Sequence, residues 1–432
     1  MPSTPLESKF DAPSGIAAGL VGLAAAFLLC GYEFIRSSAN TLFKEAAPVG
    51  YGAENLPYVM AVVPIGILIM VYGYSWLLSR LGPRKTLLAT SLLSALAIVA
   101  CYAAIAAGFR PARAILYVVR ESYIVLLIEQ YWSFLNSRLG TAAAKMYYGP
   151  ICGMGSLGAI AGDYSVAHHS RALGTLTMVL FAAAAIAPAT IFSDLAYARL
   201  GEPAAAPEEK KRTSDYLALG LFRSNALLVF LLLLIAITQV LATALDLSFQ
   251  GQLTAAFPSR DDQNAYSGEF FLRVNLAAAM GQFLFTPLLL RYAPLAFVHA
   301  AIALTNLALS GYALMHPGLG SAGLALLTFK TMDYSVFRAA KEILYIPFSY
   351  DVRYRAKEVI DVWGYRFSKG GTALCIALMK SAGAAVSILT YAAIACGAAA
   401  VWLAMIAPII RIYRRAASPA PAKADLTPGA AS

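Results

Sequence analysis

The most charged stretch of the sequence, residues 330–369, lies where apolar membrane-spanning segments are expected. Its first part carries Lys330, Asp333, Arg338, Lys341 and Glu342. On a helix these residues fall largely at spacings of three or four, so neighbours can form ion pairs along one side. An ionisable group at membrane depth costs about 2.5 to 3.5 kcal/mol on insertion scales and normally faces a bundle interior or an aqueous cavity. We therefore expect the working site here.

Charged residues also occur in other predicted spanning segments. They are Glu33, Arg36, Arg120, Glu121, Glu129, Asp163, Asp246, Glu269, Arg273, Arg366 and Lys369. Two local pairs, Glu33 with Arg36 and Glu269 with Arg273, have the spacing of ion pairs within one helix. Such pairs can hold helices together without binding a ligand. The remaining charges are expected to line a central path.

The cations of this path suit an organic anion. A guanidinium presents a planar fork that matches carboxylate or phosphate oxygens in pairs. Arg36, Arg120, Arg338 and Lys341 would supply several positive groups. The acidic residues either neutralise these cations in the empty site or carry protons. The sequence leaves both roles open.

Composition identifies a membrane protein. The chain has 432 residues, of which 59% are hydrophobic and 13% charged, whereas soluble domains are about 45 to 50% apolar and about 25% charged. The net charge of +10 comes from positive residues dispersed among short loops, which indicates membrane orientation rather than nucleic-acid binding. The five cysteines lie singly, without the spacing of a metal site or a disulfide framework.

Twelve segments are long enough to span a bilayer, each needing about 20 residues. They lie near residues 14–37, 55–79, 86–108, 113–137, 147–168, 173–198, 220–248, 267–291, 295–315, 319–345, 360–381 and 386–412. One set of loops is richer in Lys and Arg than the other, which predicts that both termini are cytoplasmic. The longest polar break begins at Gly201 and divides the segments six and six.

This division predicts a major facilitator-type architecture, in which two six-helix halves are parallel repeats. We expect a cytoplasmic tail at 1–13, six-helix bundles at 14–200 and 220–412, a linker at 201–219 and a disordered tail at 413–432. The loop Ser79–Lys85 resembles a degenerate form of the cytoplasmic loop motif of this superfamily, although the positive-inside rule explains its charges equally well. Soluble-enzyme motifs such as a phosphate-binding loop or a His-Glu-x-x-His pair are absent from the sequence.

Several motifs resemble the nucleotide transporter family of plastids and intracellular bacteria, the ATP/ADP translocases. The clearest begins Lys341-Glu342-Ile-Leu-Tyr-Ile-Pro-Phe and continues with Arg355-Ala-Lys357-Glu-Val-Ile-Asp361-Val. Ser368-Lys369-Gly370-Gly371, Trp132-Ser-Phe-Leu-Asn136 and Ala144-Lys145-Met-Tyr-Tyr also resemble family stretches. The resemblance implies the twelve-helix facilitator fold and exchange or import of nucleotides.

The family has four charged positions associated with transport. The Lys of its first helix falls at about Ala39, and the Glu of its fourth helix falls at about Arg120, with Glu121 beside it. The Glu of its seventh helix is matched by Asp246 and the Lys after its tenth helix by Lys357. The resemblance thus implies that anion-binding capacity is kept but rearranged.

We therefore expect an all-α polytopic membrane protein that moves an organic anion, such as a nucleotide or related phosphate compound, by alternating access. The predicted binding residues are Arg36, Arg120, Glu121, Asp246, Arg338, Lys341, Glu342 and Lys357, with Glu129 and Asp333 as candidates for proton coupling. We expect no cofactor and no metal. We expect the protein to be a monomer in a bacterial inner membrane. Two alternatives remain: a proton-coupled exporter of a metabolite, siderophore or drug, and a membrane receptor or assembly component that does not transport.

Overall fold

The computed structural model describes residues 12–139, 141–202, 222–223, 225–345, 348 and 359–417. This part of the chain is helical and contains no β-strand. The first bundle consists of α1 (Ala12–Lys44), α2 (Leu56–Ala106), α3 (Pro111–Arg138), α4 (Thr141–Leu173) and α5 (Thr175–Leu200). We call it the N-terminal bundle.

The second, C-terminal bundle begins with α7 (Ala226–Ala256), α8 (Arg260–Met280) and α9 (Thr286–Tyr292). It continues with α10 (Leu295–Met315), α11 (Leu319–Met332), α12 (Arg338–Ile343), α14 (Tyr365–Ser381) and α15 (Ile388–Ala417). Three π-helical segments, η3 (Gly281–Phe285), η4 (Asp333–Phe337) and η5 (Val359–Gly364), adjoin these helices. The predicted segment 319–345 is therefore α11, η4 and α12 in sequence, with the π-helix inside the charged stretch. Such π-segments occur frequently at functional sites.

Two of the predicted segments, 55–79 and 86–108, correspond to the two halves of α2, apart from one or two residues at the ends. The break between them is at Gly82, whose φ of 76° and ψ of 170° are not helical. This left-handed φ is accessible to glycine because it has no Cβ. Pro83 follows and cannot donate a backbone hydrogen bond. The chain can therefore change direction between the two halves of α2.

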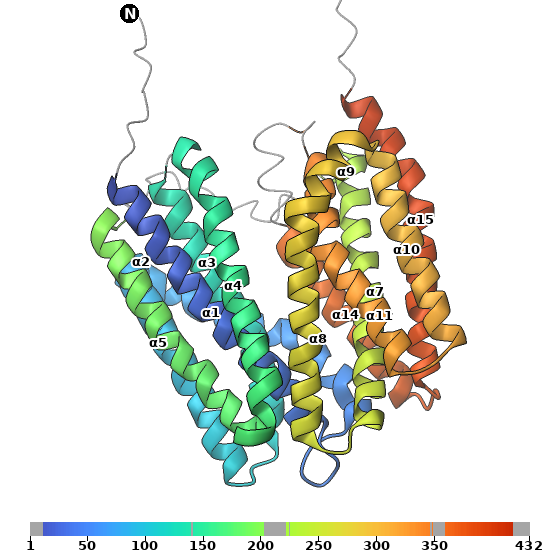
Figure 1. Ribbon diagram of the computed structural model, residues 1–432, viewed down its shortest axis with the longest axis horizontal. Helices are drawn as coiled ribbons and strands as arrows, with labels where there is room; N and C mark the ends of the chain where they lie inside the picture. The colour runs from blue at the N-terminus through green and yellow to red at the C-terminus, as the bar shows by residue number, and fades with distance from the viewer. Residues whose placement is uncertain are drawn as a thin grey trace, which may run out of the picture.

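The helices form two bundles (Figure 1), and each bundle has its own hydrophobic core. Leu28, Ile35 and Tyr123 are buried in the N-terminal bundle, and Phe329 and Trp402 in the C-terminal bundle. A third buried cluster joins the bundles, with Phe43, Leu56, Met60 and Tyr117 on one side and Leu247, Ala373, Ile376 and Tyr391 on the other. In Figure 1 the ribbons converge toward the lower edge and diverge toward the upper edge, where α1 begins and α15 ends.

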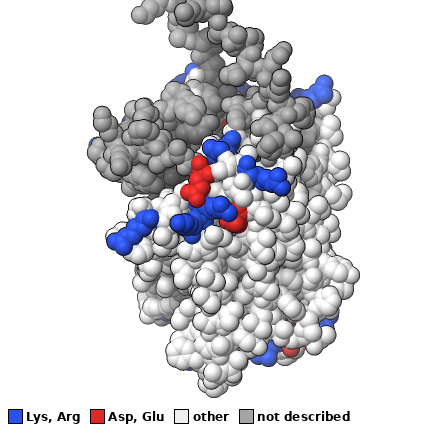
Figure 2. Space-filling view, turned by 90° about the vertical axis from the view of Figure 1, so that its left-hand side faces the viewer, with Lys and Arg blue, Asp and Glu red and all other residues white. Residues whose placement is uncertain are grey.

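The outer surface suits a lipid environment. Large apolar side chains such as Ile69, Leu157 and Phe283 are exposed by 68%, 66% and 63%, whereas a soluble monomer rarely exposes extended apolar patches. Figure 2 shows a face that is mostly uncharged, with its Lys, Arg, Asp and Glu side chains mainly in the upper half. Within the described residues, seven helices are long and apolar enough to cross a membrane. Each of the twelve predicted segments overlaps a helix, but twelve crossings remain a prediction.

Candidate substrate pocket

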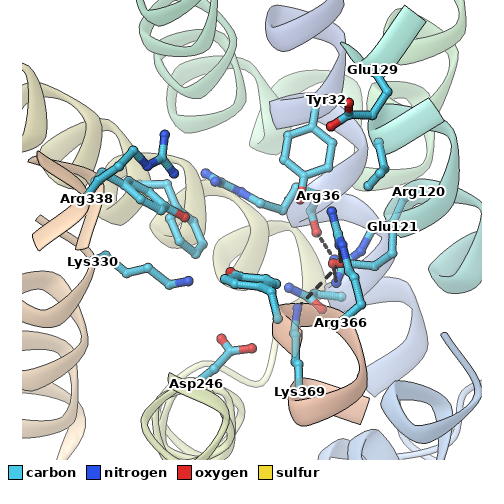
Figure 3. Close-up of a pocket in the computed structure, with 15 residues that line it drawn as sticks. Tyr32, Arg36, Arg120, Glu121, Glu129, Asp246, Lys330, Arg338, Arg366 and Lys369 are labelled. Carbon is cyan, nitrogen blue, oxygen red and sulfur yellow. Dashed lines mark hydrogen bonds and ion pairs between the residues drawn. The ribbon is translucent and has the colours of Figure 1, made fainter. Parts of the chain in front are cut away.

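A cavity of about 380 Å³ lies between the two bundles, within the range of about 300 to 1,000 Å³ usual for small-molecule sites. Its walls come from helices of both bundles (Figure 3). They are formed by Tyr32, Arg36, Asn40, Arg120, Glu121, Val125, Glu129, Asp246, Phe271, Lys330, Tyr334, Arg338, Tyr365, Arg366 and Lys369. Six of these side chains are Lys or Arg and three are Asp or Glu, so the lining has an excess of three positive charges.

On the N-terminal side, the cation of Arg36 is held by two acids. It forms ion pairs with Glu33, three residues earlier on α1, and with Asp163 of α4, where Nη2 lies 3.2 Å from Oδ1. Asn275 of α8 donates to the other oxygen of Asp163 at 2.6 Å. The guanidinium also lies 3.6 Å from the ring centroid of Phe271. The charge of Arg36 is thus neutralised by acids of its own bundle.

Arg120 and Glu121 connect three helices. Arg120 Nη1 donates to the backbone oxygen of Arg36 at 2.6 Å, and its Nη2 donates to Glu121 Oε1 at 3.0 Å. The second oxygen of Glu121 lies 3.5 Å from Lys369 Nζ and 3.6 Å from Arg366 Nη1, both on α14. Figure 3 shows these cations directed at the same carboxylate. Glu121 therefore links the N-terminal bundle to α14 of the C-terminal bundle.

On the opposite wall, Lys330 and Arg338 lie near the ring of Tyr334. Lys330 Nζ lies 5.5 Å from the ring centroid of Tyr334, and the Arg338 guanidinium lies 5.9 Å from it. In the part of the chain that the structure describes, neither cation forms a salt bridge. Lys330, Tyr334 and Arg338 are spaced by four residues and all line the pocket. Figure 3 shows Lys330 and Arg338 on the same wall. This wall can therefore accept an anion without displacing an acidic partner.

Aromatic faces accompany these charges. Tyr32, Phe271, Tyr334 and Tyr365 all line the cavity. Asp246 lies on the floor formed by α7 (Figure 3), where its carboxylate accepts a long hydrogen bond of 3.5 Å from Gln250. The arrangement can hold a planar ring between aromatic side chains, pair an anionic group with Lys330 and Arg338, and accept a hydroxyl or amino hydrogen at Asp246.

The structure brings together six of the ten residues selected from the sequence. Arg36, Arg120, Glu121, Glu129, Asp246 and Arg338 line the pocket. Lys341, Glu342 and Asp333 are absent from its walls, and Lys341 is only 9% exposed. Lys357 lies outside the described residues. The binding roles of Lys341, Glu342 and Lys357 and the proton-coupling role of Asp333 remain predictions.

The selection from sequence left out three cations and the aromatic side chains. Lys330, Arg366 and Lys369 were recognised as charges at membrane depth but not as binding residues. For Lys330 a signal was present, because its spacing of four residues to Tyr334 and eight to Arg338 puts the three on one side of a helix. For Arg366 and Lys369 the decisive neighbour is Glu121, which lies about 250 residues earlier in the chain.

Polar contacts join the two bundles at one end of the molecule. This end lies opposite the end where α1 begins and α15 ends. We call this set the interbundle latch. It consists of Lys44 with Gln250 at 2.7 Å, Asn264 with Ser170 at 3.0 Å, Arg171 with Asp262 at 2.6 Å, Glu45 with Arg260 at 2.9 Å and the backbone N–H of Thr175 with Asp261 at 2.7 Å.

Comparison with known proteins finds solved structures with a similar fold and a family whose sequences resemble part of this chain. The model of the TLC ATP/ADP transporter family matches residues 295–413. A search of curated proteins gives no match. Among solved structures, a mutant of the nucleoside transporter NupG superposes with a TM-score of 0.67 at 12% identity, covering 92% of this chain and 99% of that one.

Two further structures show the same fold. An auto-inhibited peptide transporter of the POT family gives a TM-score of 0.64 at 13% identity, covering 95% of this chain and 99% of that one. The inward-open xylose transporter XylE from E. coli gives 0.57 at 14% identity, covering 89% and 94%. The all-α, major facilitator-type fold predicted from the sequence is confirmed. Residues 295–413, in the C-terminal bundle, are therefore similar to the ATP/ADP transporter family, and the chain as a whole has the fold of major facilitator-type transporters.

Proposed function

We propose that this protein is a secondary active transporter that moves an organic anion by alternating access of its two bundles. The observation that carries the proposal is the pair Lys330 and Arg338, two cations without a salt bridge among the described residues, in a cavity between the bundles. Cations at membrane depth that form no salt bridge are costly unless they face water or a ligand. An anionic substrate would offset that cost.

A nucleotide or related phosphate compound is the substrate class we favour. Phosphate oxygens match the guanidinium of Arg338 and the ammonium of Lys330. The rings of Tyr32, Phe271 and Tyr334 offer faces on which a base can stack. The family match and the nucleoside transported by NupG agree with this class.

The conformation suits one stage of a transport cycle. The interbundle latch closes the molecule on one side of the cavity, and by the positive-inside rule that side faces away from the cytoplasm. We infer a state open toward the cytoplasm, with both termini on that side, in a bacterial inner membrane. Transport would require the latch to separate and the other ends of the bundles to meet.

A specific observation also supports the alternative of proton-coupled transport. Glu33 and Asp163 share the single cation of Arg36, and they are only 3% and 0% exposed. Two carboxylates around one guanidinium carry a net negative charge, which one bound proton would remove. Because Asn275 of the other bundle also binds Asp163, a change of protonation there would affect the contact between the bundles.

A thermal-shift screen of the purified protein in detergent tests the proposed function. Nucleotides, nucleosides, organic acids and phosphate esters would be compared, since a ligand at a hundredfold excess over Kd stabilises the folded state by about 2.7 kcal/mol. Lys330→Gln and Arg338→Gln should each weaken binding of the active anion about tenfold or more, because a hydrogen bond to a charged group contributes about 1.5 to 3 kcal/mol. The matched control is Lys85→Gln, an exposed cation outside the pocket.

Each outcome of this screen is informative. A shift with a nucleotide that both pocket variants lose supports the proposal. A shift with another anion that the variants lose keeps the transporter and replaces the substrate class. If no anion stabilises the protein, or if the control variant loses the response equally, the anion site is wrong and a non-transporting role gains support.

A further inference from the structure

A second cavity, of about 630 Å³, lies between α10 and α15. In Figure 1 these helices form the edge of the C-terminal bundle that faces away from the N-terminal bundle. The cavity is therefore a groove on the outer surface, separate from the pocket between the bundles. We call it the α10–α15 groove.

The lower part of the groove is apolar, and small side chains form much of its walls. Ala296 and Ala300, four residues apart on α10, face Leu403 and Ala407, four residues apart on α15. Alanines on both helices leave space that larger side chains would fill. The surrounding surface is apolar as well, with Phe297 exposed by 58%. The groove therefore opens toward the hydrocarbon of the membrane.

The upper end of the groove is basic. Arg411, Arg414 and Arg415 line it and are exposed. Spacings of three and four residues bring their side chains to one side of the last turns of α15. Cations near a helix C-terminus also interact favourably with the helix dipole, and the positive-inside rule accounts for their presence at this end. Neither effect explains why an apolar groove leads directly to them.

The length of the groove matches one leaflet. From Leu403 to Arg414 the helix rises by 11 residues at about 1.5 Å each, about 16 Å in total. The hydrocarbon core of a bilayer is about 30 Å thick, so this length is about half of it. The arginines then lie at the level of the lipid headgroups.

We propose that the α10–α15 groove binds one anionic phospholipid, with an acyl chain along the alanines and the phosphate held by Arg411 and Arg415. Guanidinium groups match phosphate oxygens in pairs. Charge argues against two other occupants. A second copy related by a two-fold axis along the membrane normal would bring two sets of three arginines together. The side chains of residues 418–432 include one Lys and one Asp and therefore offer no excess of negative charge.

Native mass spectrometry of the full-length protein tests this assignment. The protein would be equilibrated with phosphatidylglycerol and phosphatidylethanolamine of identical acyl chains, and the bound lipids counted. We expect one tightly retained phosphatidylglycerol. The double variant Arg411→Gln and Arg415→Gln should weaken its binding about 30-fold, since one cation near an anionic lipid surface contributes about fivefold. Retention of the zwitterionic lipid should not change.

Two further variants keep the test specific. The pair Arg80→Gln and Lys85→Gln removes two cations from the N-terminal bundle at the same end of the molecule and should leave retention unchanged. Ala300→Phe fills the apolar part of the groove and should expel the lipid while the arginines remain.

Three results would overturn the proposal. Equal losses in the two double variants would indicate general surface attraction rather than a site. Unchanged retention in the Arg411 and Arg415 variant would dismiss the arginines as phosphate ligands. A dimer peak that the groove variants abolish would assign the groove to a second copy.

Discussion

Replacing Gln250 with leucine should open the side of the molecule that the interbundle latch closes. Lys44 of α1 donates to Gln250 of α7 at 2.7 Å, and the two side chains are only 2% and 1% exposed. After Gln250→Leu, the Lys44 ammonium loses this acceptor while it remains buried. When the bundles separate, water can solvate the ammonium. The substitution therefore destabilises the closed state more than the open one.

The magnitude follows from burial. A hydrogen bond to a charged group contributes about 1.5 to 3 kcal/mol, which corresponds to a shift of about 13-fold to about 160-fold in the ratio of open to closed molecules. Arg171 and Asp262 form a closer pair, at 2.6 Å, but their side chains are 63% and 40% exposed. Such a pair contributes about 0.2 to 1 kcal/mol, so Arg171→Gln should shift the ratio by about fivefold at most.

Distances between two spin labels would measure this ratio. Labels at Phe109→Cys and Ala384→Cys, in exposed loops of opposite bundles on the latch side, would be introduced after replacement of the five native cysteines. Double electron–electron resonance then reports the fraction of molecules with the longer separation. The fraction of molecules with the longer separation should be largest in Gln250→Leu, smaller in Arg171→Gln and smallest in the wild type.

The matched control is Gln263→Leu. Gln263 is 6% exposed and donates to the backbone oxygen of Phe257 at 2.7 Å, within the same bundle. Its loss should reduce overall stability without changing the distance distribution. If Gln250→Leu leaves the distribution unchanged, or if Gln263→Leu changes it equally, the latch does not control opening.

Two further predictions concern packing and coupling. Gly158→Ala should reduce the free energy of unfolding by about 1 to 3 kcal/mol, because the added Cβ would lie 2.0 Å from the backbone oxygen of Ala26. The control Gly153→Ala should be tolerated, because its Cβ would meet nothing within 4 Å. Equal melting temperatures of the two variants would refute this account of the α1–α4 contact. Asp163→Asn should abolish flux driven by a pH gradient but preserve counterflow in proteoliposomes if the alternative of proton coupling holds, and retained pH-driven flux would remove Asp163 from that role.

Local spacing predicts the contacts within single helices. The pair of Glu33 with Arg36 and the pair of Glu269 with Arg273 were inferred from spacings of three and four, and both occur. The apolar segments and their division into two groups could also be predicted, because hydropathy depends on residues that are neighbours in the sequence. The fold class could therefore be predicted.

Contacts between distant segments were not predictable in this way. Arg36 meets Asp163 across 127 positions, and Glu121 meets Lys369 across 248. Neither separation produces a periodic signal in one sequence. The charged stretch suggested Arg338 and Lys341 as pocket cations. The walls include Arg338 but not Lys341, and they also include Lys330 on the other side of the π-helix η4. A change from α to π geometry alters which side chains face the cavity, and hydropathy does not reveal it.

The distribution of charge partners suggests how binding could be coupled to movement. In the N-terminal bundle, Arg36 has acidic partners within its own bundle. In the C-terminal bundle, Arg366 and Lys369 face Glu121 of the other bundle at distances of 3.5 to 3.6 Å. These contacts are longer than the usual charge-assisted hydrogen bonds of about 2.7 to 2.9 Å. An anionic substrate held by Lys330 and Arg338 could also attract Arg366 and Lys369 away from Glu121. On the proposed function, the contacts of Arg366 and Lys369 with Glu121, which join the bundles, would then be replaced by contacts with the substrate. Only a substrate large enough to reach from Lys330 and Arg338 to Arg366 and Lys369 would have this effect.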